Sequence, residues 1–540
     1  MKVVVTRVCR ITRATAGAWA CAGLLAMTGA AAQAAGLPST QVAWVPAAVD
    51  ADIDRAFAQA RAERKPVLLY WGATWCPPCN QLKATLFNRQ DFAALSRSFV
   101  AVHVDGDRPG AQKLGAAFQV RGYPTMILLQ PDRTEITRLP GEVDAPQVLA
   151  MLQAGLAGGR PATQVLADAR AQRPLSAAEW RLLAFYGWDI DESRLVPAAE
   201  RPAVLAALAT AATRAPSADD EARTRLLLKA LAASVEGKSG LQPDGGMRSR
   251  VERLLADTAA ARSQMDVLVN AAPALLKALA PPDGAGRAEL AAAFEAALLR
   301  LQNDTTLSRS DRITALDARV SLARGGQPED AVSPRLPEPL LKDVRELATR
   351  LDRETLDPFE RQAVIPTVAY VQSRAGLWAD SDALLKANLP RSPAPYYLMS
   401  QLGGNARKQG RTDEALRWYA QAFERSEGPA TRLQWGAGYL AALVDLAPAD
   451  AARIEQVAAQ LFTEAARDSA AFHERSGRSL QRLGQKLAAW SADRPTAEPA
   501  VQRLQAQLSG VCAAREAADG QRATCEAIAR QLSGRSNPRG

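Results

Sequence analysis

Histidine and aromatic residues are scarce in this chain of 540 residues. Its two histidines, His103 and His473, lie far apart, so the sequence offers no histidine pair of the kind that zinc sites use. Aromatic residues make up 5% of the sequence although hydrophobic residues make up 48%, because alanine and leucine carry most of the apolar content. That composition favours helices over strands.

Long apolar runs and basic stripes are also missing. Beyond residue 34, no apolar run approaches the length that crosses a membrane. Basic residues are not gathered into a stripe interleaved with aromatic ones, so we expect no nucleic-acid partner. A length of 540 residues predicts three or four domains at about 150 residues each, although stacked repeats would relax that count.

The amino terminus has the pattern of a secretory signal peptide over residues 1–34. A basic start without acidic residues precedes a stretch rich in alanine and glycine, and Ala32-Gln33-Ala34 supplies a cleavage motif. Cleavage removes four positive charges and lowers the net charge from +9 to about +5. We therefore expect a periplasmic protein. The alternative is an inner-membrane anchor formed by the uncleaved signal.

Cysteine is rare as well, with six residues in the whole chain. Two of them lie in the predicted signal peptide, so the mature chain keeps Cys76, Cys79, Cys512 and Cys525. An even number in an exported protein allows all four to be paired. The simplest arrangement is two local pairs, each close in sequence.

Strand and helix patterns alternate through residues 35–158. Continuous apolar runs predict buried strands, and apolar residues at helical spacing predict the helices between them. A hairpin and a last helix follow, which predicts a mixed sheet with helices on both faces. The expected strands are residues 40–45, 66–72, 98–105, 125–130 and 134–140, and the expected helices are residues 50–65, 110–120 and 145–156, with one more starting at the cysteines.

The remainder predicts an all-α helical array. From about residue 160 onward the sequence consists of helical segments separated by breakers at 237–246, 281–286 and 324–339. We divide it into a helical region over residues 160–326 and a second one over residues 340–532. Residues 533–540 are expected to form a disordered tail.

A repeat pattern occurs in the second helical region. Leu402, Gly403, Gly410 and Tyr419 have spacings that resemble the tetratricopeptide repeat, a helix–turn–helix of 34 residues. A weaker copy in the same phase lies 34 residues earlier. The sequence therefore predicts a tetratricopeptide-like α-solenoid, and the alternative is an irregular helical array without defined repeats.

The Cys76–Cys79 spacing suits three uses. A zinc site would need a second ligand pair, which the sequence does not offer. A structural disulfide that closes so short a loop would remove little entropy from the unfolded chain. Redox exchange remains, because a cysteine at a helix start has a lowered pKa and the next cysteine can attack a mixed disulfide.

With its neighbours, this motif resembles the thioredoxin fold over residues 41–158. The resemblance rests on WCPPC after the strand VLLYW, and on RGYPT about 45 residues later. It is also similar to the periplasmic carboxy-terminal domain of the transmembrane protein-disulfide reductase. The resemblance implies that Cys76 attacks the substrate and Cys79 resolves the mixed disulfide.

The same resemblance assigns a substrate-binding surface. In the family, the proline of the second motif is cis and lies beside the active cysteines, so Tyr123, Pro124 and Thr125 are expected to dock the substrate. Trp75 is expected to belong to an exposed apolar rim.

Two positions depart from the family pattern. Thioredoxins usually bury an aspartate where this chain has Tyr70, and a lysine where it has Ala101, so both helpers of the resolving thiol are absent. Pro77 and Pro78 also remove two N–H donors from the helix start. A less stabilised thiolate makes a weaker oxidant, which favours the reductase direction.

The distal cysteines and the single histidine of this region have simpler interpretations. Cys512 and Cys525 are expected to form a structural disulfide that joins a terminal helical hairpin, and the alternative is a relay pair for Cys76–Cys79. His103 falls in the middle of a predicted strand, where a packed or edge histidine is expected rather than a catalytic one.

The sequence thus predicts a periplasmic thiol–disulfide oxidoreductase acting on protein thiols and disulfides, without metal or organic cofactor. Its expected partners are protein substrates, a membrane electron-donor protein and a protein partner on the helical array. The alternative is a helical scaffold or assembly factor whose thioredoxin-like domain senses redox state or docks.

Overall fold

The structure is a computed structural model that describes residues 41–139, 144–157, 159–191, 194–235, 240–282, 284, 286–518 and 520–532. The predicted signal peptide and the predicted tail lie outside the described residues. Among the described helices, none has both the length and the apolar character needed to cross a membrane.

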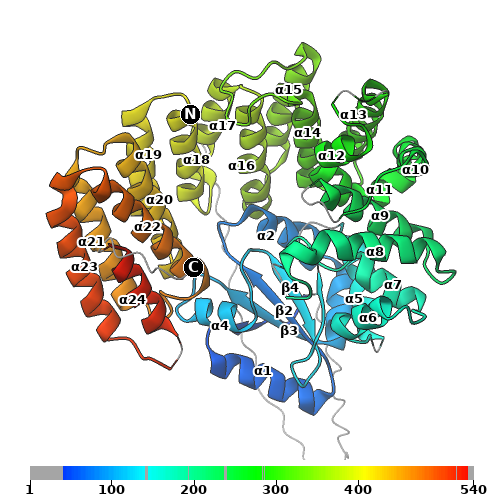
Figure 1. The fold of residues 1–540 in the computed structure, drawn as a ribbon, viewed down its shortest axis with the longest axis horizontal. Helices are drawn as coiled ribbons and strands as arrows, with labels where there is room; N and C mark the ends of the chain where they lie inside the picture. Colours follow the sequence, from blue (N-terminus) through cyan, green and yellow to red (C-terminus); the bar gives the residue numbers. More distant parts are fainter. Residues whose placement is uncertain are drawn as a thin grey trace, which may run out of the picture. The chain divides into compact units, whose positions relative to one another are not determined.

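A five-stranded mixed sheet forms the core of the amino-terminal part (Figure 1). Its order is β1-β3-β2-β4-β5, in which β1, β3 and β2 are parallel and β4 and β5 are antiparallel to their neighbours. Every residue of the central strand β2 is buried, as its continuous apolar sequence predicts for a strand covered on both faces. The strands are β1 Val45–Ala47, β2 Val67–Gly72, β3 Val100–Asp105, β4 Thr125–Leu129 and β5 Glu135–Leu139.

The first strand differs from the prediction. We expected residues 40–45, but β1 begins at Val45 and ends at Ala47. Its position is set by pairing, because Val45 lies opposite Val102 and Ala47 opposite Val104 in β3. The apolar pattern of one short segment does not specify which of its residues pair with the neighbouring strand.

Helices cover both faces of the sheet. On one face, α1 contributes Phe57 and α4 contributes Leu114 to a core beneath β2 and β3. On the other face, α2 and the π-helical turn after it, α3 and α5 pack through residues such as Phe92 and Leu152. These helices are α1 Asp50–Glu63, α2 Pro77–Leu82, the π-helical turn Lys83–Phe87, α3 Gln90–Leu95, α4 Ala111–Ala117 and α5 Ala145–Leu156.

Beyond residue 159, the described part of the chain is helical and contains no strand, as the sequence predicts. The helices are α6 Ala162–Arg170, α7 Ala177–Ala184, α8 Arg201–Arg214, α9 Asp220–Ser234, α10 Gly245–Ala256, α11 Thr258–Ser263, α12 Met265–Leu279, α13 Arg287–Asn303, α14 Arg309–Arg324, α15 Glu338–Glu354, α16 Pro358–Arg374, α17 Trp378–Asn388, α18 Pro395–Lys408, α19 Thr412–Arg425, α20 Pro429–Leu446, α21 Ala451–Arg467, α22 Glu474–Ala492, α23 Glu498–Ala513 and α24 Gln521–Leu532.

Two helix pairs repeat with the period that the sequence indicates. Gly376 joins α16 to α17 and Gly410 joins α18 to α19, 34 positions later. Both have positive φ angles, +79° and +71°, which glycine adopts without the steric cost of a side chain. Gly403 lies against the Tyr419 ring, so the small residue lets the two helices approach. The assignment to the tetratricopeptide repeat stays a prediction.

The helical region packs onto the domain that contains the sheet (Figure 1). Helix α16 contacts α2, and α22 contacts α4. At the β5 edge of the sheet, the buried side chain of Arg138 donates hydrogen bonds to the carbonyl oxygens of Phe118 and Gln119. The backbone N–H of Gly187, in the helical region, donates to the carbonyl oxygen of Arg138. Helix α16 therefore contacts the helix that begins at the cysteine motif, and α22 contacts the helix that contains Gln112.

Candidate active site

Cys76 and Cys79 lie at the start of α2, directly after the central strand. Their sulfur atoms are 2.09 Å apart and their Cα atoms 5.3 Å apart, so the structure contains the oxidised pair. Both residues are buried, with 2% and 0% of their surface exposed. Asn80 fixes the turn, because its side-chain amide donates to the carbonyl oxygens of Thr74 and Cys76 at 2.7 Å and 2.9 Å.

Backbone donors to the first sulfur are few. Cys76 is the N-cap of α2, where its Sγ accepts the N–H of Cys79 at 3.2 Å. Pro77 and Pro78 occupy the two intervening positions and have no N–H to donate. The loss of donors that the sequence predicts is therefore present in the geometry.

The second motif lies beside the first. The Tyr123–Pro124 peptide bond is cis, and the Tyr123 ring packs against the cluster that contains both cysteines. The side-chain amide of Gln112 donates to the Tyr123 hydroxyl at 2.9 Å, and the Thr125 hydroxyl donates to the carbonyl oxygen of Gly122 at 2.9 Å. The structure thus brings together the two segments that the resemblance identified.

Trp75 does not form an exposed rim, contrary to our expectation. It is half-buried because aromatic residues of the helical region cover it. Its ring stacks on Tyr397 of α18 with centroids 5.9 Å apart, and it meets the edge of Trp435 of α20 at 5.1 Å. The indole N–H donates to a carboxylate oxygen of Asp107 at 2.8 Å.

Asp107 joins the two parts of the chain. Besides Trp75, its carboxylate accepts the hydroxyl of Thr431 at 2.6 Å and forms an ion pair with Arg475. Sequence reasoning missed this network, because the partners are more than 300 positions apart and no spacing rule connects them.

The two positions that depart from the family pattern are apolar in environment. Tyr70 and Ala101 are both buried, and the Tyr70 hydroxyl has no hydrogen-bond partner among the described residues. Tyr70 stacks on His103 with centroids 5.0 Å apart. Burial raises the pKa of Tyr70, and burial followed by the charges of Lys83 and Arg108 lowers the pKa of His103 to about 4. Neither Tyr70 nor Ala101 replaces the usual proton acceptor.

A cavity of about 600 Å³ lies beside the cis proline. Pro78 and Pro124 form one side of it, and α8, α9 and α12 of the helical region form the other. Lys229 of α9 forms an ion pair with Asp189 in its wall. The remaining lining is largely small and aliphatic, and includes Leu205, Ala232, Ala233, Val267, Ala271 and Ala274.

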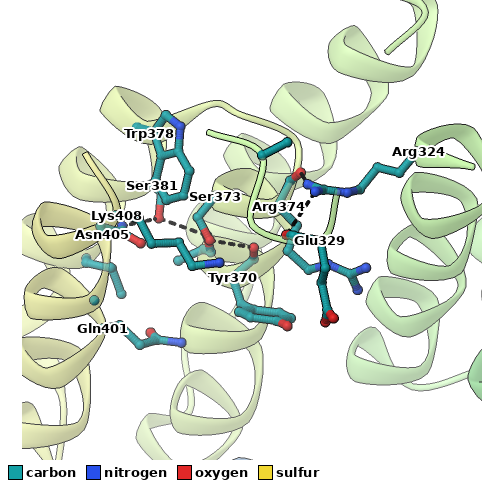
Figure 2. Close-up of a pocket in the computed structure, with 14 residues that line it drawn as sticks. Arg324, Glu329, Tyr370, Ser373, Arg374, Trp378, Ser381, Gln401, Asn405 and Lys408 are labelled. Atoms are coloured by element: carbon teal, nitrogen blue, oxygen red, sulfur yellow. Dashed lines mark hydrogen bonds between the residues drawn. The ribbon is translucent and has the colours of Figure 1, made fainter. Parts of the chain in front are cut away.

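A smaller pocket of about 240 Å³ lies between α16, α17 and α18 (Figure 2). The side-chain amide of Asn405 donates to the Ser381 hydroxyl at 3.0 Å, and Ser381 in turn donates to the carbonyl oxygen of Ala369. Arg324 donates to the carbonyl oxygens of Arg374 and Glu329. No residue of the cysteine motif or of the cis-proline loop lines this pocket, whereas Pro78 and Pro124 line the larger cavity.

The distal cysteines lie in a separate core. The sulfur atoms of Cys512 and Cys525 are 1.97 Å apart and join α23 to α24. Both residues are buried among apolar side chains such as Leu508 and Ile528.

Within the described ranges, no group of three or more histidine, cysteine, aspartate or glutamate residues is placed to hold a metal ion.

Comparisons with known proteins agree with this geometry. Residues 53–156 match the thioredoxin-like domain family. The chain is 33% identical over 120 residues to the thiol:disulfide interchange protein DsbD 2 of Pseudomonas aeruginosa, an alignment that covers 22% of this chain and 20% of that protein. The chain thus spans about a fifth of the length of such relatives.

Shorter relatives are matched over most of their length. A thioredoxin-like protein of Synechocystis is 30% identical over 89 residues, which are 16% of this chain and 80% of that protein. A solution structure of a thioredoxin from Thermus thermophilus is 28% identical, with a TM-score of 0.18, and covers 20% of this chain and 83% of that one. Through its amino-terminal domain, the chain belongs to the thioredoxin-like family.

Proposed function

We propose that this protein is a periplasmic thiol–disulfide oxidoreductase that reduces disulfide bonds in protein substrates. The observation that carries the proposal is the position of the Cys76–Cys79 pair, at the start of a helix and beside the cis Tyr123–Pro124 bond. A thiol at that position is nucleophilic, and a second thiol one turn later can resolve a mixed disulfide.

In the proposed reaction, two electrons pass from the reduced pair to the substrate. The Cys76 thiolate attacks one sulfur of a substrate disulfide, the substrate S–S bond breaks, and its leaving thiolate takes up a proton. Cys79 loses its proton and attacks the Cys76 sulfur, which breaks the mixed disulfide and releases the second substrate thiol. The enzyme is left with the Cys76–Cys79 disulfide, and a dithiol protein must reduce it again.

The reductase direction is supported by the hydrogen bonding of Cys76. Within the described part of the chain, one backbone amide, that of Cys79, reaches its sulfur, and the two prolines supply none. A thiolate with few donors is less stable, so the reduced form is less favoured and the pair is a better reductant. The export signal predicted over residues 1–34 supports a periplasmic location, where a membrane electron-donor protein would supply the dithiol.

The helical region is proposed to bind the substrate. On the Trp75 side, Tyr397 and Trp435 cover the redox site. On the side of Pro78 and Pro124, the 600 Å³ cavity lies between the site and the helical region. We therefore expect the substrate segment to approach through this cavity, between the cis-proline loop and α9 and α12.

Trapping tests the proposed reaction. With Cys79→Ser, the mixed disulfide on Cys76 cannot be resolved, so disulfide-linked substrates should accumulate on the protein in periplasmic extracts and should disappear in the Cys76→Ser, Cys79→Ser control. Absence of trapped proteins would contradict the enzymatic role. The scaffold alternative, which the burial of Cys76 favours, is supported if the double variant keeps the full cellular role.

A further inference from the structure

A cation from the helical region lies next to the redox site. Arg475 is the second residue of α22, and its guanidinium carbon is 5.1 Å from the centroid of the Trp75 ring and 5.2 Å from that of Tyr123. Both rings pack against the cluster of Cys76 and Cys79. One cation is thus in cation–π contact with an aromatic residue from each of the two motifs of the site.

Arg475 is held from its backbone and from its side chain. Its backbone N–H donates to the side-chain oxygen of Gln112 at 3.0 Å, and the same glutamine donates to the Tyr123 hydroxyl. Its guanidinium forms an ion pair with Asp107, whose other oxygen accepts the indole N–H of Trp75. Every one of these contacts ends on a residue that positions Trp75 or Tyr123.

The guanidinium is buried with incomplete hydrogen bonding. Arg475 is 9% exposed, and its Nε and Nη1 atoms have no hydrogen-bond partner within the described part of the chain. A buried donor without a partner costs free energy. Stability alone therefore does not explain an arginine at this position. The arrangement is explained if the charge and the planar fork act on the redox site.

We propose that Arg475 is a positioning residue of the redox site, which holds Trp75 and Tyr123 against the cysteine pair and balances the negative charge of Asp107 there. The proposal rests on the proposed redox function of Cys76. It makes the helical region part of the redox site, because the domain that contains the cysteines does not supply this cation.

Other charges face the same end of the sheet. Burial raises the pKa of Asp105 at the end of β3, the charge of Asp107 raises it as well, and the charges of Lys83 and Arg475 lower it. Arg108 follows in the adjacent loop. Without Arg475, the charges of Asp105 and Asp107 would be less compensated at this end of the sheet, and a negative surrounding disfavours a thiolate.

The test is a titration of Cys76 in the full mature chain with Cys79→Ala, followed by the ultraviolet absorbance of the thiolate. Arg475→Met should raise the pKa of Cys76 by about one unit, which lowers the thiolate fraction about tenfold below that pKa. Adding Asp107→Asn should reverse most of the shift, because it removes the uncompensated charge. Arg475→Lys, which keeps the charge, should shift the pKa less than Arg475→Met does.

Arg478→Met is the matched control. Arg478 lies one turn further along α22, pairs with Glu474 and donates to the carbonyl oxygen of Arg121. An unchanged pKa in Arg475→Met, or an equal shift in Arg478→Met, overturns the proposal. If Arg475→Met does not fold, the double variant Arg475→Met, Asp107→Asn decides, with Arg475→Lys beside it. A Cys76 pKa in the double variant equal to that of the parent supports charge balance. A raised Cys76 pKa in the double variant contradicts it.

The titration needs no substrate, so its outcome is independent of trapping. A shifted pKa without trapped substrates would leave the role of Arg475 standing and contradict the enzyme. Trapped substrates with an unshifted pKa would leave the enzymatic role standing and contradict the role of Arg475.

Discussion

The side-chain amide of Gln362 donates a hydrogen bond of 3.0 Å to the backbone carbonyl oxygen of Trp75, the residue that precedes Cys76. Gln362 belongs to α16, is buried, and accepts the hydroxyl of Ser392 on its side-chain oxygen at 2.7 Å. A residue of the helical region therefore fixes the backbone of the redox motif across 287 positions of sequence. The conformation of the motif and the packing of α16 are linked.

Gln362→Ala should loosen the redox motif. It removes the hydrogen bond to Trp75 and leaves a partly buried carbonyl oxygen without that donor, which should lower the free energy of unfolding by about 1–2 kcal/mol. Because the loop before Cys76 is then less restrained, the reduced Cys76 thiol should react faster with a small alkylating agent in a Cys79→Ser background. The rate of alkylation measures this.

Gln401→Ala is the matched control for Gln362→Ala. Gln401 donates to the carbonyl oxygen of Pro366 inside the helical region at 3.0 Å and is not among the residues that contact Trp75. It should change stability to a similar extent and leave the alkylation rate as it was. Equal rates in the two variants would show that Gln362 does not restrain the motif.

Filling the cavity beside the cis proline should block protein substrates. Ala271→Trp on α12 places a large ring in the 600 Å³ space, so reduction of a protein disulfide should slow several-fold, while a small alkylating agent should still reach Cys76 at the parent rate. Ala292→Trp, at an exposed position of α13, is the control. Undiminished reduction by Ala271→Trp would place the substrate elsewhere.

Adjacent glycines in α18 should respond oppositely to alanine. A Cβ atom at Gly403 would lie 3.0 Å from the Tyr419 ring, whereas one at Gly404 would be 3.7 Å from the Tyr419 hydroxyl, an ordinary contact. Gly403→Ala should lose about 1–3 kcal/mol by overpacking, and Gly404→Ala should gain up to about 1 kcal/mol from helix propensity. Denaturant unfolding measures both, and a loss at Gly404 equal to that at Gly403 would refute the packing argument.

Local patterns predicted most of the amino-terminal fold, because they depend on neighbours in sequence. The burial of β2, the apolar stripe of α1 and the place of the cysteines at a helix start follow from residues a few positions apart. The end of β1 was wrong, since its register depends on β3. The cover over Trp75 and the pair of Asp107 with Arg475 could not be predicted, because packing across hundreds of residues leaves no period in the sequence.

Removal of the distal disulfide should affect stability and leave the redox site active. The cysteines close a loop of 13 positions and are buried in the carboxy-terminal core, apart from Cys76 and Cys79. Cys512→Ala with Cys525→Ala should therefore lower the free energy of unfolding by about 3 kcal/mol. The reduction rate of a protein disulfide should stay at the parent value, and a large fall in a folded double variant would favour the relay role instead.

His103 should make the protein less stable in mild acid. Its pKa is lowered to about 4 by burial first and then by the charges of Lys83 and Arg108, against 6.5 in the unfolded chain. Between these values the unfolded state binds more protons than the folded one, so stability falls as the pH drops from about 6.5 to about 4. The loss of stability amounts to about 3 kcal/mol once both states are protonated.

His103→Phe can retain the stacking on Tyr70 and removes the titrating group. Unfolding in denaturant at several pH values should show a flatter profile for His103→Phe across that window, and an unchanged slope would mean that other groups carry the acid sensitivity.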